Sequence, residues 1–158
     1  MTVVERITHI AAPPADVLGI MLDVTEHPSW QKEVQSVEVL AADDRGRPLS
    51  TRVTVAAMGQ TATYSVAYTY GGGDSFAYHL IEGAVMTKND FTFRATADGD
   101  GSRVEVSQEI DIKWPLPGFM KDQLALKGVK DMLKALTAKA EAAIASAERS
   151  HSHGRGSE

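Results

Sequence analysis

The chain has 158 residues and a mass of 17.0 kDa, which suits one domain with a buried core. With 43% hydrophobic and 23% charged residues it has an ordinary globular composition, and no apolar run approaches the roughly 20 residues that cross a bilayer. The absence of cysteine excludes disulfides, thiolate metal sites and thiol nucleophiles. The net charge of −5 argues against a nucleic-acid-binding protein, which would show clustered excess Lys and Arg. Since the start lacks a basic segment followed by an apolar one, we expect a cytoplasmic protein.

The first part of the chain predicts one strand and two short helices. Residues 2–10 are rich in β-branched side chains, and the strand ends at Pro13 and Pro14, which cannot donate to a ladder. Residues 15–22 carry apolar side chains at three- and four-residue spacing, as an amphipathic helix does. Residues 27–30 start a second short helix, with Ser29 as its expected N-cap.

From there to residue 113 the pattern predicts a meander of six strands: 34–40, 48–58, 61–70, 75–82, 86–97 and 102–113. Turn residues separate them, including a two-residue hairpin signal at Gly59 and Gln60. Because the connections are short, sequential strands are expected to be antiparallel. The last strand alternates most regularly, with its apolar residues and Gln108 on one face and charged residues on the other.

A long helix is expected from residue 119 to 148, after the proline-rich segment 114–118. Its apolar stripe consists of Leu126, Val129, Leu133, Leu136, Ala140 and Ile144. We expect a single domain over residues 1–149 and a disordered polar tail over residues 150–158. One apolar sheet face and one long helix to cover it predict an α+β fold.

Three segments carry a resemblance to a known family. Residues 10–17 resemble the "i-x-A-p-x-x-x-V" segment of the START-like superfamily, also called SRPBCC, and residues 23–30 resemble its "D-v-x-x-y-P-x-W" segment, with His27 in place of the usual aromatic residue. Residues 101–104 resemble the "G-t-x-v" start of its last strand. Over residues 2–148 the chain is most similar to the polyketide cyclase/dehydrase and lipid-transport group. The resemblance implies the helix-grip fold: a seven-stranded curved antiparallel sheet wrapped around a long C-terminal helix, with two short helices between strands one and two.

The resemblance also implies a cavity between the sheet and the long helix for an apolar or amphipathic ligand, although a fully packed core is the alternative. Strand alternation and the resemblance give the candidate ligand-binding residues. They are Trp30, Val55, Val66, Tyr68, Tyr78, Leu80, Asn89, Phe91, Phe93, Val106, Gln108, Ile110, Phe119, Met120 and Leu124.

Four of these candidates are polar: Tyr68, Tyr78, Asn89 and Gln108. A buried hydroxyl or amide without a partner costs about 1–3 kcal/mol, so each needs a ligand, a water or a protein group. They could orient or polarise a ligand carbonyl, or serve only in structural hydrogen bonds. Catalytic residues are not assigned. Relatives with cyclase activity tend to place an acid/base side chain in the cavity, whereas Arg6, Arg52 and Arg94 fall on or near the solvent-facing side of this sheet.

No cofactor or metal is expected. The sequence has no HExxH motif and no cluster of His and carboxylate residues at ligand spacing. The glycines at 71–73 precede a strand, which is the wrong context for a phosphate-binding loop.

The main hypothesis is therefore binding or transport of a hydrophobic small molecule, lipid or polyketide-like. The alternative is a polyketide aromatase, cyclase or dehydrase that uses polar residues of the cavity. A third possibility is an interaction domain that uses the loop at Gly71. Residues 119–149 are net +2 and residues 1–118 net −7, so Lys127, Lys130 and Lys134 could make transient contact with a membrane or form a solvated face. The chain could be a monomer or a homodimer.

Overall fold

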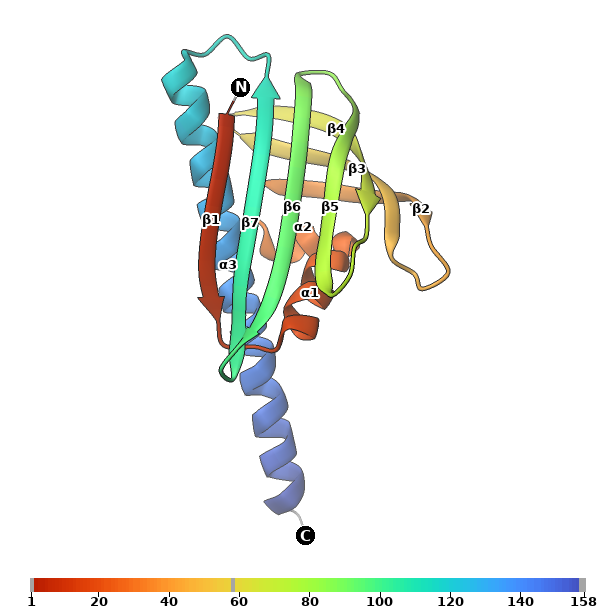
Figure 1. Cartoon of the computed structure of the whole chain (residues 1–158), viewed down its shortest axis with the longest axis vertical. Coiled ribbons are helices and arrows are strands. Elements are labelled where there is room, and N and C mark those ends of the chain that lie inside the picture. Colours follow the sequence, from red (N-terminus) through yellow and green to blue (C-terminus); the bar gives the residue numbers. More distant parts are fainter. Residues whose placement is uncertain (1, 58, 157–158) are drawn as a thin grey trace.

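Seven antiparallel strands form one curved sheet beside a long helix, as the computed structural model of residues 2–57 and 59–156 shows (Figure 1). The strands are β1 (Thr2–Ile10), β2 (Val34–Ala42), β3 (Pro48–Ala57), β4 (Gln60–Thr69), β5 (Asp74–Gly83), β6 (Met86–Asp98) and β7 (Gly101–Ile112). Their order is β1-β7-β6-β5-β4-β3-β2, so the first strand pairs with the last. Strands β2 to β7 thus form the predicted meander.

The helices cover the concave face of the sheet. They are α1 (Pro14–Leu22), the 3-10 turn η1 (Val24–Glu26), α2 (His27–Trp30) and α3 (Gly118–Gly156). Helix α3 packs mainly against β1 and α1, and its C-terminal part extends past the end of the sheet (Figure 1). This is the α+β helix-grip arrangement that the sequence predicted.

Two details of the helices differ from the prediction. Ser29 is not an N-cap, because η1 leads directly into α2 and the Ser29 hydroxyl donates a hydrogen bond back to the Glu26 carbonyl (2.7 Å). Helix α3 continues eight residues beyond the predicted end at Glu148. It thus includes residues 150–156 of the tail predicted to be disordered, while residues 157 and 158 lie outside the described residues.

The turn between β3 and β4 is shifted by one residue from the prediction. Ala57 pairs with Gln60, which leaves residues 58 and 59 as the two turn positions, of which residue 58 lies outside the described part of the chain. Gly59 has a φ of 75°, a left-handed conformation that glycine adopts without steric cost. The left-handed glycine thus occupies the second turn position and leaves Gln60 free to begin β4.

The core lies where β6 and β7 meet the helices. Alternate residues of these strands are buried, including Phe91, Phe93, Val104 and Val106, as expected when one face of a sheet is covered. The stripe of α3 is buried at Val129, Leu133, Leu136 and Ala140, but Leu126 is 36% exposed and Ala125 occupies the buried position instead. The buried stripe is thus rotated slightly from the predicted one at the start of the helix.

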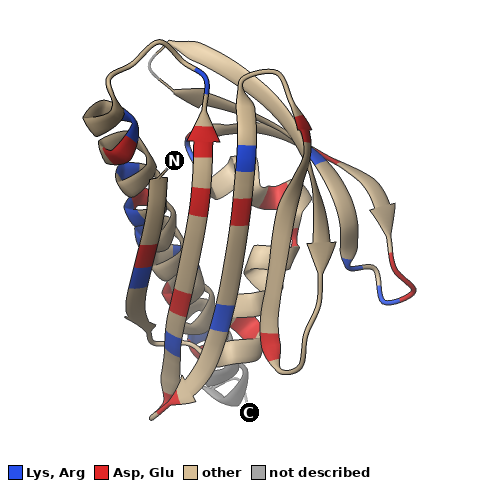
Figure 2. Cartoon of the chain, turned by 45° about the horizontal axis from the view of Figure 1, so that its top comes forward, with Lys and Arg blue, Asp and Glu red and all other residues tan. Residues whose placement is uncertain are grey.

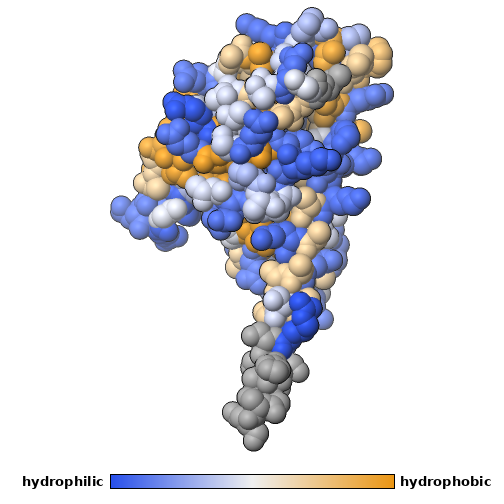
Figure 3. All heavy atoms as spheres, turned by 180° about the vertical axis from the view of Figure 1, so that it is seen from behind, coloured by the Kyte–Doolittle hydropathy of each residue, from blue (hydrophilic) through white to orange (hydrophobic). Residues whose placement is uncertain are grey.

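The two edge strands of the sheet, β1 and β2, differ in their packing and in the regularity of their pairing. At the β1 edge α3 packs closely, although Val3 and Ile7 are exposed; at the other edge Val39 and Leu40 of β2 are exposed. The pairing of β2 with β3 is irregular, with register shifts between residues 34 and 36 and between 39 and 42. Seen from behind, hydrophobic residues reach the surface in patches among hydrophilic ones (Figure 3).

Charged residues are spread over the outside of this framework. Lys and Arg recur along α3, while Asp and Glu are distributed along the sheet and its turns (Figure 2). Several outward charges are paired, for example Lys88 with Glu109 (3.1 Å) on neighbouring strands. Such exposed pairs contribute little stability, so the charge pattern bears on partners more than on the fold.

Candidate ligand-binding cavity

An inner cavity lies between the concave face of the sheet and the helices, in two adjoining compartments. One compartment has a volume of about 210 Å³ and contains most of the ring-bearing residues of the cavity; we call it the aromatic compartment. The other has about 430 Å³ and is lined mainly by aliphatic residues; we call it the aliphatic compartment. Residues common to both linings mark the junction between them: Glu33, Val55, Tyr64, Gln108 and Gly128.

The aromatic compartment has a continuous wall of rings from β4, β5 and β6. Tyr68 lies 5.5 Å from Tyr78, and Tyr78 stacks on Phe91 with ring centroids 5.0 Å apart. Phe76 lies 5.9 Å from Phe91 and 5.8 Å from Tyr68. These separations are typical of stabilising aromatic pairs, so the rings form one packed surface.

The tyrosine hydroxyls of this wall stay protonated over the physiological range. Burial raises the pKa of Tyr68 to about 12. Burial, reinforced by the neighbouring tyrosines, also raises the pKa values of Tyr64 and Tyr78 well above the usual 10. A buried phenolate lacks solvation, which is why the neutral form is favoured. The tyrosines of this compartment therefore offer neutral hydrogen-bond donors to an oxygen-bearing ligand.

Two amides continue the polar line towards the aliphatic compartment. The Gln108 side-chain nitrogen donates a hydrogen bond to the Asn89 oxygen (3.0 Å), and Asn89 itself is 1% exposed. The Asn89 nitrogen in turn lies 3.8 Å from the Met86 sulfur. Because Gln108 uses its nitrogen on Asn89, its carbonyl oxygen is the group that can serve as an acceptor at the junction.

The aliphatic compartment lies nearer the start of α3. Its lining comes from β3, β4, β6, β7 and α3, and its apolar part includes Ala56, Ala57, Ala62, Val85, Met86, Ile110, Ile112, Trp114, Leu124 and Ala125. Lys127 and Asp131, an ion pair one turn apart on α3, form the charged part of the rim together with Glu33. An apolar lining with a few polar groups at the edge is typical of small-molecule sites.

His27 also lines the aromatic compartment, a position that sequence reasoning missed. Its Nε2 lies 2.8 Å from the Met21 carbonyl oxygen, so this nitrogen carries the proton and donates to the end of α1. The ring meets Trp30 edge to face, with centroids 5.2 Å apart. Burial lowers the pKa of His27 below 6.5, and the hydrogen bond opposes that fall. The imidazole is therefore neutral near pH 7, and the aromatic expected at this position by the resemblance is replaced by a ring that can exchange a proton.

Most of the predicted site residues come together in this cavity. The linings include Val55, Val66, Tyr68, Tyr78, Asn89, Phe91, Gln108, Ile110 and Leu124. Trp30 and Leu80 pack partly buried against the core, and Phe93 and Val106 are buried within it, without lining either compartment. Met120 is half-buried near the start of α3 and also lies outside the two linings.

Phe119 is not brought to the cavity, because its side chain is 64% exposed. At about 100° per residue, a position six residues before the buried Ala125 points roughly 120° away from it. The periodicity of α3 alone could have placed Phe119 outside.

Several lining residues were not among the candidates. Tyr64 shares the alternation of Val66 and Tyr68 and could have been found from the sequence. Glu33 lies in the connection before β2, where no alternation orients a side chain. Gly128 has no side chain, so no hydrophobic pattern marks it.

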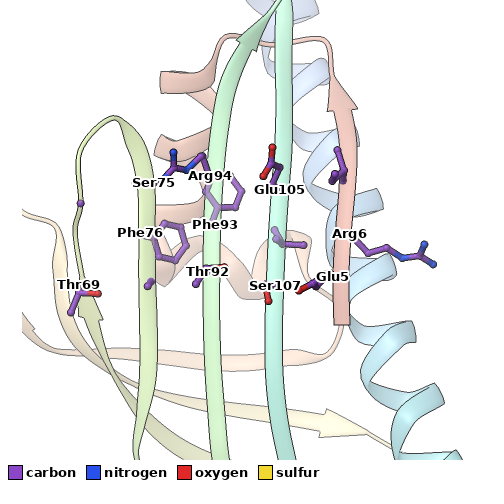
Figure 4. A pocket seen from close by; sticks show the side chains of 14 residues that line it. Glu5, Arg6, Thr69, Ser75, Phe76, Thr92, Phe93, Arg94, Glu105 and Ser107 are labelled. Atoms are coloured by element: carbon purple, nitrogen blue, oxygen red, sulfur yellow. The ribbon is translucent and has the colours of Figure 1, made fainter. Parts of the chain in front are cut away.

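A larger but different hollow lies on the outer face of the sheet (Figure 4). It has a volume of about 930 Å³ and is formed by β1, β5, β6 and β7 with the ends of β4. The residues around it include Glu5, Arg6, Ser75, Thr92, Arg94, Glu105 and Ser107 (Figure 4). The lining of this groove is more polar than that of the inner cavity, and the side chains of Phe76 and Phe93 beneath it are almost completely buried. The inner cavity, which combines apolar walls with placed donors, is the better candidate site.

Metal-binding clusters and membrane-spanning helices are both absent from the described residues. No group of three or more His, Asp or Glu side chains in residues 2–57 and 59–156 is arranged to hold a metal ion. Within the same residues, no helix combines the length and the apolar character needed to cross a membrane.

Solved structures with this architecture include proteins of several descriptions. A START superfamily protein from Mycobacterium smegmatis is 27% identical, with a TM-score of 0.82 over 89% of this chain and 98% of its own. An aromatase/cyclase from a Streptomyces species is 18% identical, with a TM-score of 0.73 over 88% and 93% of the two chains. A STAR-related lipid transfer protein from Xanthomonas axonopodis is 16% identical, with a TM-score of 0.66 over 87% and 84%. The last two likenesses show a shared fold alone.

No curated protein sequence matches this chain significantly. The sequence profile of one family, described as polyketide cyclase / dehydrase and lipid transport, matches residues 1–145. That span includes all seven strands, both short helices and the part of α3 that lines the cavity. The chain therefore belongs to the polyketide cyclase / dehydrase and lipid transport family.

Proposed function

We propose that this protein binds a hydrophobic small molecule, lipid or polyketide-like, in the inner cavity and carries it. The observation that supports this most directly is the cavity itself: an apolar space on the concave face with protonated donors along one wall. The aliphatic compartment, at about 430 Å³, falls in the range of about 300–1,000 Å³ that small-molecule sites occupy. Exposed Lys130 and Lys134 on α3 would assist transient contact with an anionic membrane during delivery.

A pair of substitutions on β3 tests the proposal. Val55 lines both compartments, whereas its neighbour Thr54 bonds to Thr63 (3.0 Å) on the other face of the sheet. We expect Val55→Trp to fill the cavity and weaken saturable binding of the fluorescent probe 8-anilinonaphthalene-1-sulfonate at least tenfold. Thr54→Trp, the matched control, is expected to bind the probe as the wild type does. Fluorescence titration gives both values, with circular dichroism to verify folding.

Equal binding by the two tryptophan variants would show that the probe lies elsewhere, for example in the outer groove. Absence of saturable binding by the wild type would count against ligand binding altogether.

The second candidate is an aromatase or cyclase acting on a polyketide-like substrate. Its specific support is the set of protonated hydroxyls at Tyr64, Tyr68 and Tyr78 beside a neutral imidazole at His27, since such groups can polarise a carbonyl and move a proton. We expect Tyr78→Phe to reduce turnover of a poly-β-ketone thioester at least tenfold under this candidate.

Tyr70→Phe is the control for this experiment, because the Tyr70 hydroxyl donates to the Pro48 carbonyl and the residue lies outside both linings. Product formation is followed by chromatography. No turnover by the wild type, or equal rates in both variants, would leave binding and transport as the function.

A further inference from the structure

Gly128 lies inside α3, where glycine weakens a helix relative to alanine because it has more backbone freedom to lose. Two structural reasons commonly account for a glycine, and neither holds here. The described glycines with positive φ are Gly46, Gly59, Gly73 and Gly99, and Gly128 is not one of them. A Cβ atom at Gly128 would meet no neighbouring heavy atom within 4 Å, whereas at Gly101 it would lie 2.4 Å from a backbone oxygen. Backbone conformation and close packing therefore leave this glycine unexplained.

Its position in the cavity supplies a different reason. Gly128 contributes to the lining of both compartments, and across from it the sheet contributes Val55, Tyr64 and Gln108 to the same junction. Gly128 is exposed, and no heavy atom lies within 4 Å of a Cβ placed on it, so a side chain here would enter open space at the edge of both compartments. The missing side chain thus leaves space free where the aromatic and aliphatic compartments adjoin.

We propose that Gly128 determines ligand specificity by leaving this junction open to an elongated amphipathic molecule. An oxygen-bearing ring lies against the tyrosines of the aromatic compartment, and an aliphatic chain passes under Gly128 into the aliphatic compartment. The inference rests on the proposed function, because it assumes that the inner cavity holds the ligand. It adds a chemical class: a neutral polar ring with an alkyl tail longer than the aromatic compartment, of about 210 Å³, can contain.

A series of 4-n-alkylphenols provides the test, since the phenol ring is constant and only the tail grows. We expect wild-type affinity to rise with chain length by up to about fourfold for each added methylene that is buried. In Gly128→Leu, 4-ethylphenol is expected to bind within twofold of the wild type and 4-octylphenol at least tenfold more weakly. Isothermal titration calorimetry measures each affinity.

Gly19 provides the matched control, because it is also helical, also has open space at its Cβ position, and lies outside both linings. Gly19→Leu is expected to bind the whole series as the wild type does. Should Gly128→Leu fail to fold by circular dichroism, Gly128→Val is judged by the same loss for 4-octylphenol, at a threshold of threefold.

The possible outcomes distinguish a failure of the role of Gly128 from a failure of the proposed ligand binding. A wild type that binds the series with a chain-length dependence unchanged in the Gly128 variant would overturn the role of Gly128 and leave ligand binding intact. A wild type that binds none of the alkylphenols would overturn the amphipathic ligand class, and failure of the Val55→Trp comparison would remove the cavity as a binding site.

Discussion

His27 joins the cavity to the helices that precede β2. Its ring lines the aromatic compartment, while its Nε2 hydrogen bond to Met21 holds the end of α1. Of the nearby charges, Asp23 favours the protonated ring, but burial outweighs it and lowers the pKa of His27. A buried neutral histidine of this kind makes folding sensitive to acid, because the unfolded chain takes up the proton more readily.

This gives a pH prediction with a definite sign. Since the folded-state pKa lies below 6.5, the stability contributed by neutral His27 is complete above pH 6.5 and is lost as the pH falls through the folded pKa. We expect wild-type stability to decrease between pH 7.5 and 5.5 by more than that of His27→Phe. At pH 7.5 the variant should be less stable by about 1 kcal/mol, the value of a lost hydrogen bond. Urea denaturation at the two pH values measures this.

Other titrating groups are present in both proteins and cancel in the comparison. An identical pH dependence in the wild type and in His27→Phe would contradict the assignment of a lowered pKa to this histidine.

Individual site residues could be predicted where a strand fixes the direction of the side chain. Alternation correctly put Tyr68 and Tyr78 on the concave face, and the same rule would have included Tyr64. It could not predict Glu33, which precedes β2, nor Gly128, whose importance comes from the volume that it leaves empty. The alternation of side chains along a strand shows which face of the sheet a residue occupies. It does not show whether that residue borders a cavity or packs against another side chain.

Helix α3 stabilises the fold through the stripe that faces the sheet. Leu136 is completely buried, whereas Lys134, two residues earlier, is exposed. We expect Leu136→Ala to reduce the free energy of unfolding by about 2–5 kcal/mol, because it removes buried methyl groups and leaves a cavity. Lys134→Ala should change it by less than about 0.5 kcal/mol. Urea denaturation of both variants tests this, and similar losses in the two would mean that α3 is not docked as described.

The elements themselves were largely predictable, and their deviations have local causes. Glycine and aspartate turns separate the strands, and alternation identifies β7 almost residue by residue. Helix boundaries were less accurate: the turn η1 before α2 was not predicted, and α3 ran past Glu148. At the start of α3 the predicted stripe included Leu126, but packing against the sheet buries Ala125 instead.

For the whole molecule, the sequence predicted the architecture but could not establish the cavity. The fold follows from one apolar sheet face, one long helix and short turns, all of which are local signals. The cavity is the volume left between α3 and strands β3 to β7. Its size therefore depends on the distance in space between elements that are far apart in the sequence. The net charges of +2 for residues 119–149 and −7 for residues 1–118 likewise concern the surface of the molecule and do not identify a ligand.

The irregular pairing of β2 affects how readily this edge could pair with a strand of a second molecule. An edge strand with exposed Val39 and Leu40 would normally invite another strand to extend the sheet. The register shifts around Val34 and between Val39 and Ala42 bend β2 and interrupt the even row of amide and carbonyl groups that an incoming strand needs. A deletion that regularised the pairing of β2 with β3 would thus convert this edge into a template for chain association, and would make the protein prone to aggregate while its core stayed unchanged.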